Sequence, residues 1–159
     1  MTEMKRILWM DDQYEDLIDY AGRLFRTGYL IEPVKSVSAA LEKLVKDRYD
    51  AYIFDLKVLP GDDPVWQELD EKIRKGKPFF DPYLGIEFLR FLYEEKKMNS
   101  ELWRRIEFDF NKVIIFSAAC EGNVREELES FGISKHQMLN RFISDLDNLP
   151  QLLKKINRT

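Results

Sequence analysis

The sequence predicts an α/β domain in which a parallel β-sheet carries helices on both faces. Five short apolar runs are spaced along the chain, and most of them are unbroken rather than alternating, which is typical of strands buried on both faces. Segments with apolar residues at helical spacing lie between these runs. This regular exchange of strand and helix predicts a sheet of parallel strands.

The predicted strands are the apolar runs themselves. They span Ile7–Met10, Tyr29–Val34, Ala51–Phe54, Val113–Phe116 and Met138–Ile143. Proline has no backbone N–H to donate, so Pro33 restricts the second run to an edge of the sheet. The fifth run is the most polar and suits the opposite edge. The strand order 2-1-3-4-5 meets both conditions, and it is the order of flavodoxin-like three-layer sandwiches.

Each predicted helix has an apolar face and a residue suited to one of its ends. Gly28 and Gly132 end the first and fourth helices, Ser38 caps the second, Gly85 opens the third, and Pro150 stands in the first turn of the last. The side chains expected to face inward are Leu17, Ala21, Leu24, Phe25, Leu41, Leu44, Val45, Phe88, Leu89, Leu92, Leu149, Leu152, Leu153 and Ile156.

The composition favours a globular domain and argues against nucleic-acid-binding and membrane-spanning proteins. The chain has 159 residues, 45% of them apolar and 34% charged, which fits a single globular domain over residues 1–159. The net charge of −4 argues against general nucleic-acid binding, which requires a basic face. No apolar run is long enough for a transmembrane helix, and the single cysteine fits a reducing compartment. We therefore expect a cytoplasmic protein that binds neither nucleic acid nor membrane.

Carboxylates follow two neighbouring strands of the predicted sheet. The run ILWMDD ends in Asp11 and Asp12, and AYIFD ends in Asp55. Ligands of such sheets bind beyond the carboxyl ends of the strands, beside the point where the strand order reverses, and strands 1 and 3 flank that point. Clustered carboxylates repel one another, and a hard divalent cation relieves the repulsion. The sequence therefore predicts a Mg²⁺ site at this edge of the sheet.

Two further polar residues are expected at the same edge. Strand 4, in the stretch KVIIFSAA, delivers Ser117, and strand 5 could deliver the positive charge of Arg141. Carboxylates, a metal ion, a hydroxyl group and a fixed cation form a set that is suited to holding a phosphoryl group.

In the motifs ILWMDD, YDAYIFD and IIFSA, and in Gly85, the chain resembles a response-regulator receiver domain of the CheY-like superfamily. The resemblance implies that Asp55 is the phosphoacceptor. Asp11, Asp12, Asp55 and the backbone carbonyl of Lys57 would then bind Mg²⁺, while Ser117 would hydrogen-bond the phosphoryl oxygen.

The resemblance also implies a role in a two-component system. The phosphoryl group would come from a histidine kinase or a phosphotransfer protein, and phosphorylation would alter the contact with a downstream protein partner. Since the last predicted helix extends almost to Thr159, we expect a stand-alone domain without an output domain. Such a domain receives the phosphoryl group and is not itself an enzyme.

The family pattern is not matched at three positions. Arg141 occupies the place of a lysine that receiver domains carry at the end of the fifth strand, and arginine is longer, planar and differently hydrated. Met138 stands where the family often has an aromatic residue. Pro60 lies one residue further from Asp55 than the family's loop places it.

A long insertion, at about residues 59–84, separates the third strand from the third helix. Gly85 follows Asp55 by 30 positions, where receiver domains need only a short loop. Asp63 is suited to an N-cap, Pro64 to a first helical turn and Gly76 to a helix end, so a short helix is expected between them.

The role of the insertion's aromatic residues stays open. Trp66, Phe79, Phe80 and Tyr83 could form a lid over the acidic pocket, present a surface to a partner, or cover the flank of the domain. A second surplus, KKMNSELWRRIEFDFN, should extend the third helix or add a turn before the fourth strand.

Two other functions compete with phosphoryl acceptance. A degenerate receiver could serve as a protein–protein interaction scaffold without phosphorylation, and Arg141, Met138 and the insertion favour this hypothesis. A Mg²⁺-dependent phosphohydrolase of the haloacid-dehalogenase type also uses an aspartate at a strand end. That family requires two aspartates separated by one residue, whereas Asp11 and Asp12 are adjacent.

Overall fold

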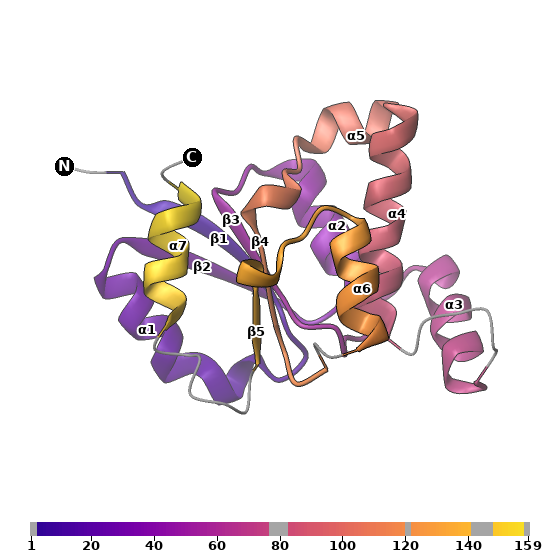
Figure 1. Ribbon diagram of the computed structural model, residues 1–159, viewed down its shortest axis with the longest axis horizontal. Helices are drawn as coiled ribbons and strands as arrows, with labels where there is room; N and C mark the ends of the chain where they lie inside the picture. Colours follow the sequence, from indigo (N-terminus) through magenta and orange to yellow (C-terminus); the bar gives the residue numbers. More distant parts are fainter. Residues whose placement is uncertain (1–2, 77–82, 120–121, 141–147, 158–159) are drawn as a thin grey trace.

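The computed structural model describes residues 3–76, 83–119, 122–140 and 148–157, and these form a parallel sheet between two layers of helices (Figure 1). The strand order is β2-β1-β3-β4-β5, as predicted. The described strands are β1 (Lys5–Met10), β2 (Tyr29–Val34), β3 (Ala51–Phe54), β4 (Val113–Ser117) and β5 (Met138–Asn140). The remainder of the predicted fifth strand lies outside the described residues.

The helices cover both faces of the sheet. On one face lie α1 (Ile18–Arg26), which follows a 3₁₀ turn at Tyr14–Leu17, and α7 (Leu149–Asn157). The other face is covered by α2 (Val37–Lys46), α4 (Leu84–Met98) and α6 (Asn123–Ser130). Within the described part of the chain, no helix is both long and apolar enough to span a membrane.

Alternate side chains of each strand enter two separate cores. Leu8, Met10, Tyr52 and Phe54 join the core under α2, α4 and α6, whereas Ile7, Trp9, Ala51 and Ile53 join the core under α1 and α7. All eight side chains are buried, which explains why the strands read as unbroken apolar runs in the sequence.

β2 lies at an edge of the sheet, as Pro33 requires. Pro33 pairs with Trp9 of β1, and no described strand lies on the other side of β2. A proline ring is tolerated here because an edge strand forms ladder hydrogen bonds on one side only.

Two predictions about the helices are wrong. Ser36, not Ser38, caps α2, since the Ser36 Oγ accepts a hydrogen bond of 3.1 Å from the Ala39 N–H. Phe25 was expected to face inward, but 54% of its surface is exposed. It follows the buried Leu24 directly in the last turn of α1, and successive residues of a helix point about 100° apart, so the two side chains face different sides.

The insertion contains the predicted helix, α3 (Pro64–Arg74), which lies outside α4 at the periphery of the molecule (Figure 1). The Asp63 carboxylate accepts a 2.9 Å hydrogen bond from the Val65 N–H, and Pro64 occupies the first turn. Gly76 follows the helix with a φ of 69°, the left-handed conformation that favours glycine.

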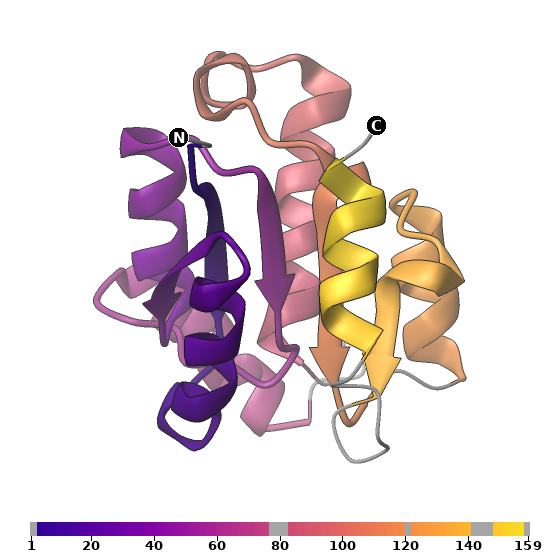
Figure 2. The same cartoon turned by 90° about the vertical axis from the view of Figure 1, so that its left-hand side faces the viewer.

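The second surplus forms a separate helix, α5 (Glu101–Ile106), and a 3₁₀ turn at Phe110–Lys112 before β4, so the second of the two alternatives is confirmed and α4 is not extended. Asn99 ends α4 in the left-handed conformation, and the Ser100 Oγ then accepts a hydrogen bond of 3.0 Å from the Trp103 N–H. α5 lies at the end of the sheet opposite the strands' carboxyl ends (Figure 2).

Candidate functional site

The acidic residues that follow β1 and β3 lie side by side at the carboxyl end of the sheet. Met10 pairs with Phe54, so Asp11 and Asp55 each come directly after a paired residue. The Asp55 N–H donates to the Met10 carbonyl at 2.9 Å, and the Asp11 N–H donates to the Val34 carbonyl at 2.9 Å. These bonds continue the backbone pairing beyond the strands and fix where both side chains begin.

The side chains of Asp11, Asp12 and Asp55 form one cluster. Each offers a carboxylate oxygen, and these three oxygens all lie within 4.8 Å of one another. Asp11 is 0% exposed and Asp55 is 6% exposed, whereas Asp12 is half-buried. In general, ionised carboxylates that are buried close together repel one another and lose hydration. Both costs must be offset by a bound cation or by hydrogen-bond donors.

Backbone N–H groups orient the two buried carboxylates. The Gln13 N–H donates to Asp11 Oδ1 at 2.9 Å, and the Leu56 N–H donates to Asp55 Oδ1 at 2.7 Å. The Lys57 N–H lies 3.4 Å from the same Asp55 oxygen. These donors hold the plane of each carboxylate side chain.

The cluster fits a small divalent cation. Mg²⁺ prefers carboxylate and water oxygens at about 2.0–2.1 Å in octahedral geometry, so opposite ligands stand about 4.2 Å apart. The observed spread of up to 4.8 Å between the three carboxylate oxygens is only slightly wider. The donor set is therefore suited to Mg²⁺ in both chemistry and spacing.

Gly85 holds the segment after Asp55 in place. Its N–H donates to the Leu56 carbonyl at 2.9 Å, at the first turn of α4. A Cβ atom at position 85 would come within 2.7 Å of the Leu56 Cα and 2.9 Å of the Asp55 carbonyl oxygen. The absence of a side chain thus lets α4 begin directly against the backbone that carries Asp55.

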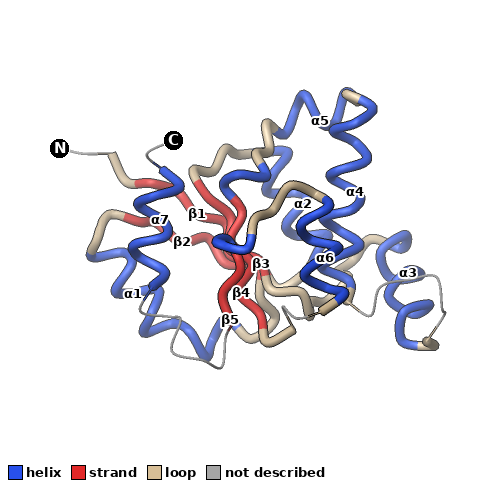
Figure 3. Tube along the Cα trace, viewed as in Figure 1, coloured by secondary structure: helices blue, strands red, loops and turns tan. Residues whose placement is uncertain are grey.

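The next segment, residues 57–61, runs along the start of α2. The Leu59 carbonyl accepts a hydrogen bond from the Val37 N–H at 2.9 Å, and the Pro60 carbonyl accepts one from the Ser38 N–H at 3.1 Å. The Ser38 hydroxyl also bonds to this segment, donating to the Pro60 carbonyl at 2.5 Å. This loop, which leaves the carboxyl end of β3 (Figure 3), is therefore fixed to the neighbouring strand–helix connection.

Ser117 is the last residue of β4 and is buried. Its Oγ accepts a hydrogen bond of 3.2 Å from the Ala119 N–H. Because Phe54 pairs with Ile115, Ser117 lies near the level of Asp55 along the sheet. On the other side Ser117 pairs with Asn140. Arg141, the next residue and the predicted cation of the site, lies outside the described residues.

The last turn of α3 shares a cavity with Asp12, the most exposed member of the cluster, which the sequence did not indicate. A cavity of about 340 Å³ lies between this turn and Asp12. Arg74, which pairs with Asp70 at 2.9 Å, and Lys57, whose Nζ lies 5.6 Å from the centre of the Tyr83 ring, both line this cavity. Asp70 and Arg74 are four residues apart, and this spacing predicts that they pair on a helix. It does not predict that the end of this helix lies near Asp12.

Trp66 is not part of a lid over the cluster. It is buried, and its ring packs edge-on against Phe88 and Phe91 of α4, with centroid distances of 5.8 and 5.4 Å. For Trp66, the reading in which the insertion covers the flank of the domain is therefore correct. Phe79 and Phe80 lie outside the described residues.

Neither a protein-family model nor a curated protein matches this sequence. Similar folds occur among solved structures. The receiver domain of a Francisella response regulator is 19% identical, with a TM-score of 0.61 and coverage of 97% of both chains. A chemotaxis response regulator of Vibrio cholerae is 16% identical, with a TM-score of 0.60 and coverage of 96% of this chain and 98% of its own.

A third similar structure was solved with a metal ion. It is the receiver domain of a Pseudomonas aeruginosa sensor histidine kinase, with a magnesium ion coordinated in its active-site cleft. Its identity to this chain is 18% and its TM-score 0.59, covering 98% of this chain and 99% of its own. The chain therefore has the CheY-like fold of response-regulator receiver domains.

Proposed function

We propose that this chain, which has the receiver fold, accepts a phosphoryl group on Asp55 in a Mg²⁺-dependent reaction of a two-component signalling system. The observation that carries the proposal is the cluster of Asp11, Asp12 and Asp55 at the carboxyl ends of β1 and β3. In open parallel sheets this is the place where ligands bind, beside the reversal of strand order.

Asp11, Asp12 and Asp55, together with the backbone carbonyl of Lys57, are the proposed Mg²⁺ ligands. When bound, Mg²⁺ supplies positive charge that offsets the repulsion between the carboxylates and the incoming phosphoryl oxygens. The magnesium ion in the Pseudomonas receiver domain supports this assignment, and so does the spacing of the three carboxylate oxygens.

Asp55 is the proposed nucleophile. One of its carboxylate oxygens attacks the phosphorus atom and forms the new P–O bond, while the bond between phosphorus and the donor breaks and its electron pair stays on the donor. The Leu56 N–H, 2.7 Å from Asp55 Oδ1, holds the carboxylate plane during the attack. The product is an acyl phosphate on Asp55.

Ser117 and Arg141 are proposed to contact the transferred group. The Ser117 hydroxyl, at the end of β4, would donate a hydrogen bond to a phosphoryl oxygen, and the Arg141 guanidinium would supply a fixed positive charge. The donor would be a histidine kinase or a phosphotransfer protein. Phosphorylation would then change the contact with a downstream protein, so the chain is a recipient of the phosphoryl group rather than an enzyme that turns over.

The proposal is tested by following phosphorylation and metal binding separately. The protein is incubated with acetyl phosphate, with Mg²⁺ or with EDTA, and intact mass spectrometry measures addition of one phosphoryl group. We expect the addition only with Mg²⁺, and we expect Asp55→Asn to abolish it. Asp62→Asn, which changes an exposed carboxylate outside the cluster, is the matched control and should be phosphorylated normally.

Metal binding is followed by tryptophan fluorescence, to which Trp9 contributes; Trp9 lies two residues before Asp11 and its ring packs against Tyr14 and Phe116. Mg²⁺ should change this fluorescence, and beryllofluoride should change it further in the wild type but not in Asp55→Asn. Mg²⁺ binding without phosphorylation by any donor would contradict the proposal and favour the scaffold function.

A further inference from the structure

The insertion helix creates a groove on the flank of the molecule, away from the acidic cluster. The groove has a volume of about 510 Å³ and lies between α3 and α4, with Leu41 of α2 at its margin. Its apolar lining residues are Leu41, Val65, Trp66, Leu69, Phe91 and Met98. Since α3 forms one wall of the groove, the groove exists only because of the insertion.

The groove has a buried floor and an exposed apolar rim. Trp66 is buried against Phe88 and Phe91 and fixes the floor. At the rim, Val65 is 70% exposed and Met98 is 66% exposed, which places both among the most exposed large apolar side chains of the described residues. An apolar strip of this kind in water is typical of a surface that another molecule covers.

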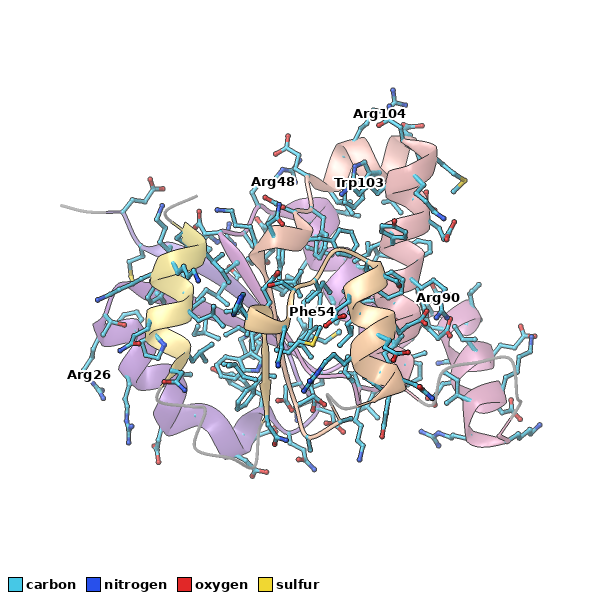
Figure 4. All side chains as sticks on the ribbon, viewed as in Figure 1. Arg26, Arg48, Phe54, Arg90, Trp103 and Arg104 are labelled. Atoms are coloured by element: carbon cyan, nitrogen blue, oxygen red, sulfur yellow. The ribbon has the colours of Figure 1, made fainter. Side chains whose placement is uncertain are left out.

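The charge around the groove is strongly negative. Among the described residues, Asp63, Glu87, Glu94 and Glu95 line it together with one cation, Arg90, so that this part of the lining carries a net charge of −3. Arg90 is already engaged, because it pairs with Glu87 at 2.5 Å and with Glu127 of α6. Figure 4 shows Arg90 on the part of α4 near α3. Glu94 in turn pairs with Lys97 at 2.9 Å, and the Asp63 carboxylate caps α3. The described lining is therefore negative overall, with Glu95 as the carboxylate best placed to meet a basic ligand.

We infer that this groove binds an amphipathic helix of a partner protein, with apolar side chains on one face and lysine or arginine beside them. The walls are two helices, and the groove has no sheet edge, so a ligand is recognised through side chains and not through backbone pairing. The negative rim selects basic neighbours of the apolar anchors. A second copy of this chain carries a net charge of −4, so its charge matches the negative lining of the groove less well than a basic helix does.

The residues of the groove are spaced to suit a helical ligand. Along α4, Glu87, Phe91, Glu94 and Met98 recur at intervals of three and four, so they lie in one row along the helix. α3 contributes Val65 and Leu69 in the same way. Apolar anchors at helical spacing in a ligand can fill the space between two such rows.

The inference is tested with three peptides of roughly 14 residues that share one apolar helical face and differ only in the flanking residues. These are lysine, glutamine or glutamate. Fluorescence anisotropy should give a Kd on the order of 10 μM for the lysine peptide, weaker binding of the glutamine peptide and no binding of the glutamate peptide. Added salt should reduce the advantage of the lysine peptide over the glutamine peptide.

Variants then locate the binding. Val65→Asn should weaken binding of the lysine peptide by about tenfold, because Val65 is an exposed apolar contact, and Ile18→Asn on α1 is its control. Glu95→Lys should weaken binding of the lysine peptide and strengthen binding of the glutamate peptide. Glu129→Lys on α6 is its control and should change the Kd of each peptide less. Backbone amide NMR shifts in Val65–Leu69 and Phe91–Met98 should mark the contact.

The binding does not depend on phosphoryl acceptance, so Asp55→Asn should bind the lysine peptide as the wild type does. If the phosphorylation experiment fails, the inference about the groove is unaffected. If the peptides do not bind, the proposed phosphorylation of Asp55 is unaffected. Equal binding of all three peptides, no binding at about 1 mM peptide, or amide shifts confined to α1 would overturn it. Sedimentation that reveals self-association lost in Val65→Asn would also overturn it, because a second copy would then occupy the groove.

Discussion

Gly85 lies so close to the backbone after Asp55 that no side chain fits in place of its hydrogen. An added Cβ would meet the Leu56 Cα at 2.7 Å and the Leu56 carbonyl oxygen at 2.8 Å. These are backbone atoms of the segment that carries the proposed nucleophile, so they cannot rotate away as the end of a flexible side chain can. The residue therefore determines how near α4 comes to the site.

Gly85→Ala should lower the free energy of unfolding by about 2–3 kcal/mol, because α4 or the segment after Asp55 must shift. Urea unfolding measures the loss, and Mg²⁺ affinity should fall with it. Gly22→Ala is the matched control. Gly22 lies within α1, and its added Cβ would meet nothing nearer than 3.8 Å, so this change should stabilise the protein by about 0.5–1 kcal/mol. Equal effects of the two changes would contradict the steric argument.

Glu32 gives the stability of the sheet a dependence on pH. Burial alone raises the pKa of Glu32, but hydrogen bonds from Arg6 and Tyr49 outweigh this, and the net pKa is lower than the ordinary value of 4.5. The pKa of Glu32 is lower in the folded state than in the unfolded state. The contribution of its ionised carboxylate to the free energy of unfolding is therefore complete above pH 4.5, and it is lost as the pH falls through the pKa of the folded state. Arg6 belongs to β1 and Tyr49 precedes β3, so Glu32 links three parts of the sheet.

The prediction is a comparison of Glu32→Gln with the wild type by urea unfolding between about pH 7 and pH 3. Wild type should be more stable by a constant amount in the upper part of this range, and the difference should shrink in the acid part. Glu129→Gln, on the exposed side of α6, is the control. A difference that stays constant throughout would show that Glu32 contributes through its shape and not its charge.

At the scale of elements, hydrogen bonds join the start of α2 to the start of the insertion. Ser36 and Ser38 are two positions apart, and either could cap a helix from its local sequence. The choice is settled by a distant segment, because the Ser38 hydroxyl donates to the Pro60 carbonyl and accepts a 3.2 Å hydrogen bond from the Asp63 N–H. Local sequence predicts the helix here, while a long-range contact decides its first residue.

Ser36→Ala and Ser38→Ala should therefore have different consequences. Ser36→Ala removes the cap of α2 and should cost about 1 kcal/mol in urea unfolding. Ser38→Ala should loosen the start of α3, seen as faster hydrogen exchange at the Val65 amide. Each change serves as the control for the other, and faster exchange at Val65 in Ser36→Ala alone would reverse the assignment.

At the scale of the whole molecule, the proposed Mg²⁺ site should make stability depend on the metal. Asp12→Asn removes one of the three neighbouring charges. In EDTA this variant should be more stable than the wild type by about 1 kcal/mol, since like charges raise the free energy of the folded state. In saturating Mg²⁺ the order should reverse, because ligand binding stabilises the wild type more. Thermal unfolding in both buffers checks this, and an unchanged order would argue against metal binding by Asp12.

Much of the fold could be predicted because its signals are local. The apolar runs define β2 and β3 to the residue, and Pro33 alone places β2 at an edge. The meeting of Asp11, Asp12 and Asp55 follows from their positions after parallel strands. The packing of Trp66 could not be predicted, because it depends on which side of α4 the insertion covers. The exposure of Phe25 likewise depends on how α1 is rotated against the sheet, which the helical spacing of apolar residues does not fix at the end of a helix.

Pro33 has one more consequence, which concerns the growth of the sheet. In an edge strand whose inner side pairs with β1, the proline ring stands on the side where an additional strand would seek a backbone donor. A continuous ladder of hydrogen bonds cannot form past this residue. The molecule is thus protected along β2 against joining edge to edge into an extended fibre, even though Leu30 of the same strand is exposed.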